Sequence, residues 1–230
     1  AVDIAKESAD IILLEKDLMI LEQGVVEGRK TFGNFIKYIK ITVSSAFGNM
    51  LSMTIAACWL PFEPMSCIQI LILNMIYDFS QYTIPWDNVD KSFYALPRQW
   101  NPKSIFKFMI CIGPISSIFD ITSFLIMYYV MKWDTVDGSK EKLFQTGWFL
   151  MSLLTQTAVV YVLRTEKIPF VQSLPSAGVN ASNGISLIIG LTLCLINGLE
   201  NGANLMSLAT ANNAWWILYS ILIVGGYMLT

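Results

Sequence analysis

Residues 70–81, ILILNMIYDFSQ, are apolar enough to lie inside a lipid bilayer, yet they carry polar side chains at regular intervals. Asn74, Asp78 and Gln81 follow one another at spacings of four and three residues, which puts them on one face of a helix. A carboxylate near the middle of a bilayer costs at least about 2.5–3.5 kcal/mol, so such a residue usually has a partner or a function. The stretch therefore predicts a membrane helix with a functional polar face.

The composition of the whole chain supports this interpretation. Of its 230 residues 54% are hydrophobic and 14% are charged, whereas soluble domains carry about 25% charged residues. The net charge of −2 offers no basic surface for nucleic acid, and the absence of histidine removes the commonest metal ligand and general base. We expect an integral membrane protein with no nucleic-acid partner.

The cysteines are few and widely separated. Cys58, Cys67, Cys111 and Cys194 each lie in an apolar run, with no spacing that suggests a disulfide framework or a zinc site. We expect them to be small buried hydrophobic residues.

Six apolar segments have lengths near the roughly 20 residues that a bilayer requires. They cover about residues 41–60, 66–85, 105–131, 144–163, 183–199 and 213–229. The fold class expected for residues 41–230 is therefore an all-α bundle of six transmembrane helices.

The charged residues 1–40 precede this bundle. We expect a helix in AKESA, a short buried strand in DIILLEK, and a long helix from about residue 18 that enters the first span without a break. The chain thus begins with a short α/β segment and a stalk helix.

The distribution of basic residues predicts the orientation. Residues 1–40 hold six, residues 86–107 hold four, and Arg164 and Lys167 follow the fourth span. The alternate loops hold only Lys132, Lys140 and Lys142. This bias places both ends of the chain in the cytoplasm, in agreement with an even number of spans.

Polar residues in the first three spans form a candidate metal site. The turn PFEPM at 61–65 is short, so the first two spans are antiparallel neighbours, with Asn49 about 12 residues before the turn and Asp78 about 13 after it. Two carboxylates with amide oxygens at one depth suit Mg²⁺ or Ca²⁺. We predict a site formed by Asn49, Asn74, Asp78 and Asp120.

The alternative is that buried polar groups bond the helices together. That interpretation is favoured for Gln156 in the fourth span, and it is as good as the ligand interpretation for Gln81.

The order of these motifs resembles the C-terminal part of a P-type cation-transporting ATPase. AVDIAKESADIILLEKDLMIL and VVEGRKTFGNFIKYIKITVSS look like the end of the phosphorylation domain and the stalk, and LILNMIYD matches the N-x-x-x-D of the sixth membrane helix. QILILNMIYDFSQYTIPWDNVD, RQWNP, GPISSIFD and RTEKIPFVQS are most similar to bacterial magnesium-transporting ATPases. The resemblance covers residues 1 to about 173.

The resemblance implies a function for the longer protein. It implies Mg²⁺ import across the inner (plasma) membrane, driven by the hydrolysis of MgATP. The actuator, nucleotide-binding and phosphorylation domains that carry out this hydrolysis would lie upstream in the same protein. This chain contains no DKTGT, TGES or GDGxND, so we expect no catalytic residue in it and no ATP hydrolysis by it alone. One departure is Ala46, where magnesium pumps usually read SSNFGN, so one amide is missing.

Two other functions stay open from the residues themselves. The chain could belong to a pump for another cation, such as Ca²⁺ or Na⁺/K⁺. It could also be a free-standing bundle that acts as a passive channel or membrane scaffold.

Overall fold

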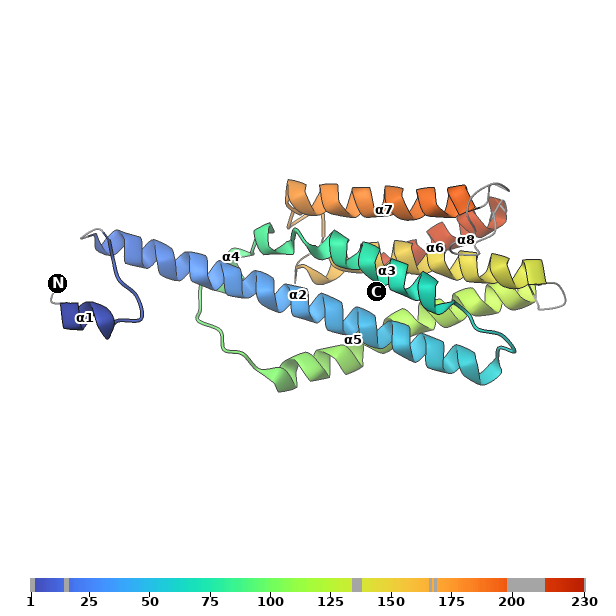
Figure 1. Ribbon diagram of the computed structural model, residues 1–230, viewed down its shortest axis with the longest axis horizontal. Coiled ribbons are helices and arrows are strands. Elements are labelled where there is room, and N and C mark those ends of the chain that lie inside the picture. Colours follow the sequence, from blue (N-terminus) through green and yellow to red (C-terminus); the bar gives the residue numbers. More distant parts are fainter. Residues whose placement is uncertain are drawn as a thin grey trace.

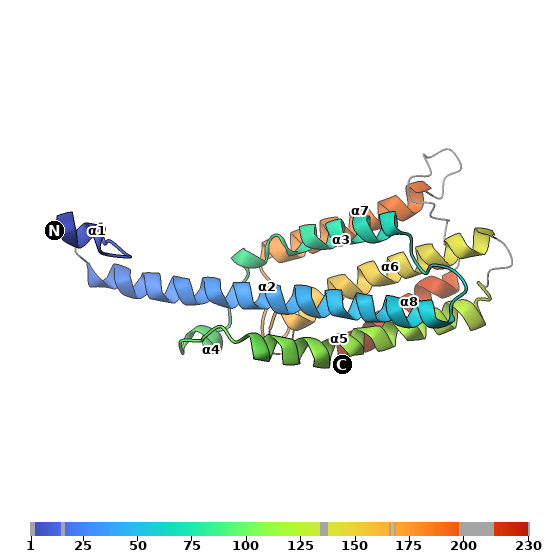
Figure 2. The ribbon, with the colours of Figure 1, turned by 60° about the horizontal axis from the view of Figure 1, so that its bottom comes forward.

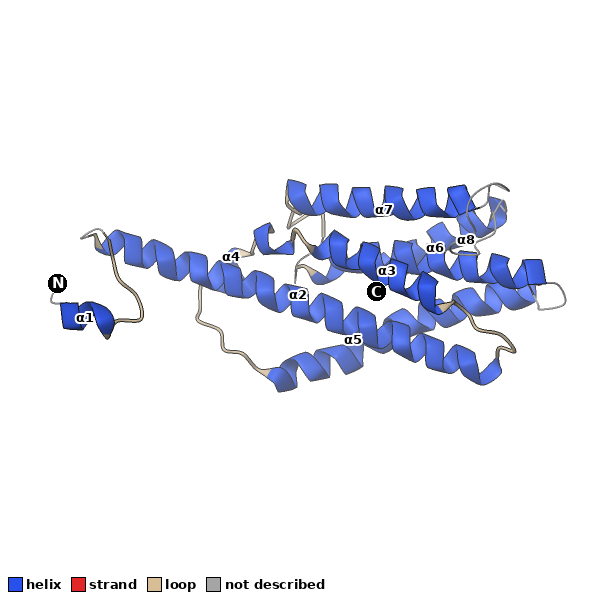
Figure 3. Cartoon of the chain, in the orientation of Figure 1, coloured by secondary structure: helices blue, strands red, loops and turns tan. Residues whose placement is uncertain are grey.

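The computed structural model describes residues 3–14, 17–133, 138–165, 167, 169–197 and 214–229, and they are predominantly helical (Figure 3). The helices are α1 (Asp3–Glu7), α2 (Leu18–Trp59), α3 (Cys67–Gln81), a 3₁₀ turn (Ile84–Trp86), α4 (Lys91–Tyr94), α5 (Pro102–Leu125) with a π-helical end (Ile126–Val130), α6 (Gly138–Leu163), α7 (Ala177–Asn197) and α8 (Ala214–Leu229). Within these ranges there is no β-strand, only an isolated bridge between Pro169 and Ser173. The all-α prediction is confirmed.

The longest element is α2, with 42 residues. The side chain of Asp17 caps its N-terminus by accepting a hydrogen bond from the backbone N–H of Met19 at 2.9 Å. At 1.5 Å per residue the helix is about 63 Å long, and its N-terminal end projects beyond the other helices of the bundle (Figure 1). The expected unbroken helix from a polar stalk into the first apolar segment is confirmed.

The strand expected in DIILLEK is wrong for the part of it that the structure describes. Residues 10–14 form no strand, and Leu14 is 97% exposed. A strand is stable only when a neighbouring strand pairs with its backbone, and no described residue does so here. The helix expected in AKESA is present as α1.

Four helices are long and apolar enough to cross a membrane by length and composition. They are Leu18–Trp59, Pro102–Val130, Lys140–Leu163 and Ala177–Cys194, and Tyr219–Met228 is a shorter apolar helix. Helix α3 has 15 residues. These elements support a membrane bundle, while six crossings remain a prediction, and the expected spans at 183–199 and 213–229 extend partly outside the described residues.

Helix α6 lies at the centre of the bundle, between α3 and α7 on one side and α2 and α5 on the other (Figure 2). Its Phe144, Phe149 and Met151 are fully buried, and Phe124 of α5 packs against Phe144 and Trp148. Interdigitated aromatic side chains therefore form the core between α5 and α6.

The cysteines do not lie where the sequence analysis expected them. Cys58, Cys67 and Cys111 are exposed and Cys194 is half-buried, so the prediction of small buried hydrophobic residues is wrong for the first three. All four are free thiols, and an exposed apolar side chain on a membrane helix can contact lipid instead of protein.

Helices α2 and α5 cross closely because the residues at the crossing are small. A Cβ atom on Gly48 would lie 3.1 Å from the carbonyl oxygen of Gly113 and 3.2 Å from the Cβ of Ser116. The hydroxyl of Ser117 donates to the carbonyl oxygen of Gly48 at 2.9 Å. Small residues with an interhelical hydrogen bond are the usual basis of close helix packing in membranes.

Replacing Gly48 with Val should separate this crossing and destabilise the bundle by about 1–3 kcal/mol, as overpacking of a close contact does. Gly24→Val is the matched control, because nothing lies within 4 Å of a Cβ on Gly24 of the same helix. Thermal unfolding in detergent would measure both variants. Equal losses would contradict the crossing as described.

A buried carboxylate holds together one end of the bundle. Asp87, in the connection before α4, has a side chain only 1% exposed and accepts from Lys37 Nζ at 3.1 Å and from Arg164 Nε at 3.0 Å. Its other oxygen accepts from the backbone N–H of Ser176 at 3.1 Å. Asp87 thus links α2, the end of α6 and the residues just before α7.

The surroundings keep Asp87 ionised. Burial by itself would raise the pKa of the carboxyl, but the hydrogen bond from Arg164, the charge of Lys37 and the backbone N–H of Ser176 together hold the pKa below its usual value. Two cations share one carboxylate, and Lys37 also donates to the carbonyl oxygen of Asn88 at 2.7 Å. The ion cluster of Lys37, Asp87 and Arg164 is therefore paired and hydrogen-bonded throughout.

Asp87→Asn should lower the free energy of unfolding by about 3–5 kcal/mol at pH 7, because it leaves two buried cations without their counter-charge. Since the folded pKa is depressed, this stabilisation is present above about pH 4, the unfolded value, and is lost as the pH falls through the folded pKa. Denaturation curves of the wild type and the variant should therefore converge in acid. Glu27→Gln, which removes an exposed pair with Lys30, is the control and should change little.

Candidate cation site

One hydrogen bond determines the register of α2 against α3. Thr42 Oγ1 donates to Gln81 Oε1 at 2.7 Å. Asn49 comes seven residues after Thr42 and Asn74 seven residues before Gln81, so in two antiparallel helices these two residues lie at the same level. Gln81 is buried and bonds the helices together, which is one of the two roles that the sequence left open for it.

Asn49 and Asn74 line a cavity of about 210 Å³ between α2, α3 and α6. Trp148 and Ser152 close its α6 side. The remaining wall is mostly apolar and consists of Ala46, Met50, Met53, Met65, Ile70 and Leu73. Two amides and one hydroxyl in an apolar chamber form a small set of neutral oxygen ligands.

Ala46 belongs to this cavity wall. The position at which the chain departs from the SSNFGN pattern therefore bears directly on the candidate site. An alanine there leaves space where an amide side chain would otherwise extend.

Asp78 does not face Asn49 as the sequence analysis expected. It lies one helical turn beyond Asn74, at the level of Ser45 in the register described above, and it is exposed on α3. Counting from the observed helix ends would still place the two at one depth, because Asn49 lies ten residues before Trp59 and Asp78 eleven residues after Cys67. The offset of about one turn follows from how α3 lies against α2, as the Thr42–Gln81 bond indicates.

Asp120 is buried in the contact between α5 and α2. Its Oδ2 lies 2.6 Å from the hydroxyl oxygen of Ser52, and its exposed fraction is 1%. Ser52 follows Asn49 by three residues, so Asp120 lies behind the cavity, beside the indole of Trp148 that lines it. The structure brings together Asn49 and Asn74 and leaves the two carboxylates apart.

The described ranges contain no group of three or more His, Cys, Asp or Glu side chains that could hold a metal ion. A site in this region would have to use amide and hydroxyl oxygens as well. Ser152 and Gln156 are both buried on α6, and among the described residues neither the hydroxyl nor the Gln156 amide has a hydrogen-bond partner. Helix bonding by Gln156, favoured from the sequence, is not observed, and Ser152 was missed because serine is common in membrane helices.

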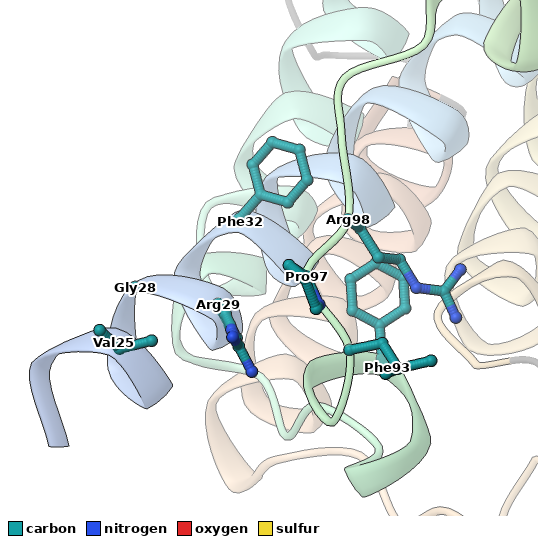
Figure 4. A pocket seen from close by; sticks show the side chains of 8 residues that line it. Val25, Gly28, Arg29, Phe32, Phe93, Pro97 and Arg98 are labelled. Atoms are coloured by element: carbon teal, nitrogen blue, oxygen red, sulfur yellow. The ribbon is translucent and has the colours of Figure 1, made fainter. Parts of the chain in front are cut away.

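A second cavity, of about 240 Å³, lies where the polar half of α2 meets the segment around α4 (Figure 4). Arg29 Nη1 donates to the carbonyl oxygen of Tyr94 at 3.3 Å, and the Arg98 guanidinium lies 4.3 Å from the centre of the Phe93 ring. Both arginines line the cavity and would repel a cation. We therefore interpret this cavity as part of a structural contact between the stalk and the α4 segment. We call this contact, made by Arg29 with Tyr94, the bracket.

Comparison with known proteins identifies the family of this chain. Residues 62–229 match the family described as "Cation transporting ATPase, C-terminus". The chain belongs to the cation-transporting P-type ATPases. It is 54% identical over 83% of its length to "Magnesium-transporting ATPase, P-type 1" of Salmonella typhimurium, and 46% identical over 99% of its length to the protein of that name in Escherichia coli.

A more distant relative is named for a different ion. The chain is 25% identical over 55% of its length to "Calcium-transporting ATPase type 2C member 1" of mouse, of which it covers 14%. It spans 21% of the Salmonella protein and 25% of the Escherichia coli protein. The chain thus corresponds to the C-terminal part of these P-type ATPases.

The register can be tested by cross-linking. In a background without native cysteines, the pair Asn49→Cys and Asn74→Cys should form a cross-link with a short bis-thiol reagent, because both positions line one cavity. The pair Asn49→Cys and Asp78→Cys should react at least several-fold more slowly, since the second position lies about one turn away. A faster reaction of the 49/78 pair, seen as a shifted band after proteolysis of the α2–α3 turn, would contradict the register.

Proposed function

We propose that this chain is the membrane part of an ATP-driven P-type pump that moves Mg²⁺ into the cytoplasm. The observation that carries the proposal is the identity of 46–54% to proteins named as magnesium-transporting ATPases, over 83–99% of this chain. The relative named for calcium has about half that identity over a shorter stretch. Import, as opposed to export, rests on the resemblance of the motifs.

We assign the ion to the cavity between α2, α3 and α6. Asn49 and Asn74 would supply amide oxygens, and Asp78, one turn further along α3, would supply a carboxylate from the open side. Mg²⁺ sheds water reluctantly and is held by one or two carboxylates, so a sparse site that retains several waters is adequate for it. Ca²⁺, which takes six to eight oxygens, would be served less well.

Asp120 has a supporting role in this proposal. Its carboxylate contacts Ser52, one turn from Asn49, and it adds negative charge behind the cavity without lining it. It can therefore attract a cation toward the site and hold α2 against α5. Asp120 would become a direct ligand only if the packing of α5 against α2 changed.

Coupling to ATP would pass along α2. A helix without a break transmits a displacement of its polar half to Asn49, and the bracket at Arg29 and the ion cluster at Asp87 tie that half to the neighbouring loops. The phosphorylated aspartate and the MgATP site would belong to the upstream domains of the longer protein.

The proposed location is the inner (plasma) membrane, with lipid around the apolar helices and both ends of the chain on the cytoplasmic side. Four helices with membrane-spanning length and the concentration of basic residues in alternate loops support it. The ion cluster of Lys37, Asp87 and Arg164 would then lie at the cytoplasmic end of the bundle.

Asp78→Asn in a full-length protein that contains this chain should abolish Mg²⁺-stimulated ATPase activity. The carboxylate would be the only charged ligand at the cavity, and its loss leaves neutral oxygens alone. Met75→Leu, an exposed position on the same helix, is the matched control and should retain activity. Unchanged activity of Asp78→Asn would refute the site.

Stimulation by Ca²⁺ or by Na⁺ and K⁺ in place of Mg²⁺ would indicate a different pump, and an open reading frame without DKTGT upstream would indicate a channel or scaffold.

A further inference from the structure

Another cavity, distinct from the one near α4, adjoins the candidate cation site. It has a volume of about 400 Å³ and lies at the turn between α2 and α3, where Glu63 and Cys67 are on its wall. Met53, Met65 and Ile70 line both this cavity and the inner one that contains Asn49 and Asn74. The two chambers are therefore neighbours, separated by an apolar neck of three side chains.

The outer chamber is suited to a cation. Glu63 is exposed and is the one Asp, Glu, Lys or Arg residue on the wall of this chamber, and the turn at 61–65 contains no Lys or Arg. Six waters at about 30 Å³ each occupy about 180 Å³, so the outer chamber has room for a hydrated divalent ion and the inner one has little to spare.

The turn that carries Glu63 is held in place by a buried polar network. Gln145 of α6 donates to the backbone carbonyl of Glu63 at 3.1 Å and accepts from Gln69 Nε2 at 3.4 Å. Gln69 in turn completes the cap of α3 with Ser66. The backbone that carries the Glu63 side chain is thus held in place at the cavity.

We propose that the two chambers form the route by which a hydrated divalent cation passes between the outer solution and Asn49 and Asn74, with Glu63 attracting the ion at the mouth. Met65 is the gate of this route: it is only 2% exposed, and its flexible thioether chain can move aside. An apolar constriction of this kind excludes water and ions until it opens. The inference rests on the proposed function for the ion and for the orientation.

The test uses the full-length protein in intact cells, with Cys67 as the remaining cysteine. A membrane-impermeant cationic methanethiosulfonate added outside should modify Cys67 and inhibit transport, and saturating Mg²⁺ should slow the modification. Glu63→Gln should lower the ratio of cationic to anionic reagent rates about fivefold, the effect of removing one nearby charge. Glu63→Asp should restore the ratio, and it keeps the test informative if the glutamine variant does not reach the membrane.

A protein with Cys58 as the remaining cysteine is the matched control. Cys58 is exposed near the same end of α2 but does not line the outer chamber, so its modification should neither inhibit transport nor respond to Mg²⁺ or Glu63. Unreactive Cys67, or reactivity that is independent of Mg²⁺ and of Glu63, would overturn the route.

The activity of the unmodified parent protein separates this inference from the proposed function. If Mg²⁺-stimulated ATPase activity is present and Cys67 behaves like Cys58, the route alone fails. If that activity is absent, the proposed function fails, and the charge selectivity at Cys67 still decides whether the outer chamber attracts cations.

Discussion

Helix α2 runs without a break from Leu18 to Trp59. The contacts that the other elements make with the stalk and with the cavity are arranged along this one helix. The bracket at Arg29, the ion cluster at Lys37, the close crossing at Gly48 and the amide of Asn49 all lie on this one helix. These four features are therefore spaced along one continuous element at about 1.5 Å per residue.

The attachments along α2 differ in kind. At the polar end, buried charges are compensated by one another and by backbone groups, as around Asp87. Further along, Gly48 allows direct backbone contact with α5, and no charge is involved. Between α2 and α3 the packing opens into a chamber. Tight contact on one side of α2 and open space on the other give this helix one firm neighbour and one loosely packed neighbour.

Helix α3 has many exposed side chains along its middle. Leu71, Met75 and Phe79 are exposed on that helix, together with Asn74 and Asp78. The same helix is fixed at both ends, by the Ser66 cap and the Gln69–Gln145 contact at one and by the Thr42–Gln81 bond at the other. Helix α3 is therefore held at its ends while its middle, with Asn74 and Asp78, is exposed.

The sequence by itself determined the all-α class, the unbroken stalk helix and the residues that carry polar groups into apolar segments. These features follow from local properties: apolar runs of bilayer length, the helical period, and the cost of a charge in lipid. The strand predicted in DIILLEK is absent from its described residues 10–14, because strand formation depends on a partner that the apolar pattern does not reveal.

Only the tertiary structure decided which polar groups meet. Asn49 and Asn74 line one cavity because of the offset between α2 and α3, which the Thr42–Gln81 bond indicates and a count of residues from the turn does not. Asp87, Lys37 and Arg164 are separated by 50 and 77 residues, and each looks like an ordinary charge at the end of an apolar segment. Helical periodicity tells which residues share a face; the rotation and offset of one helix against another come from contacts between distant side chains.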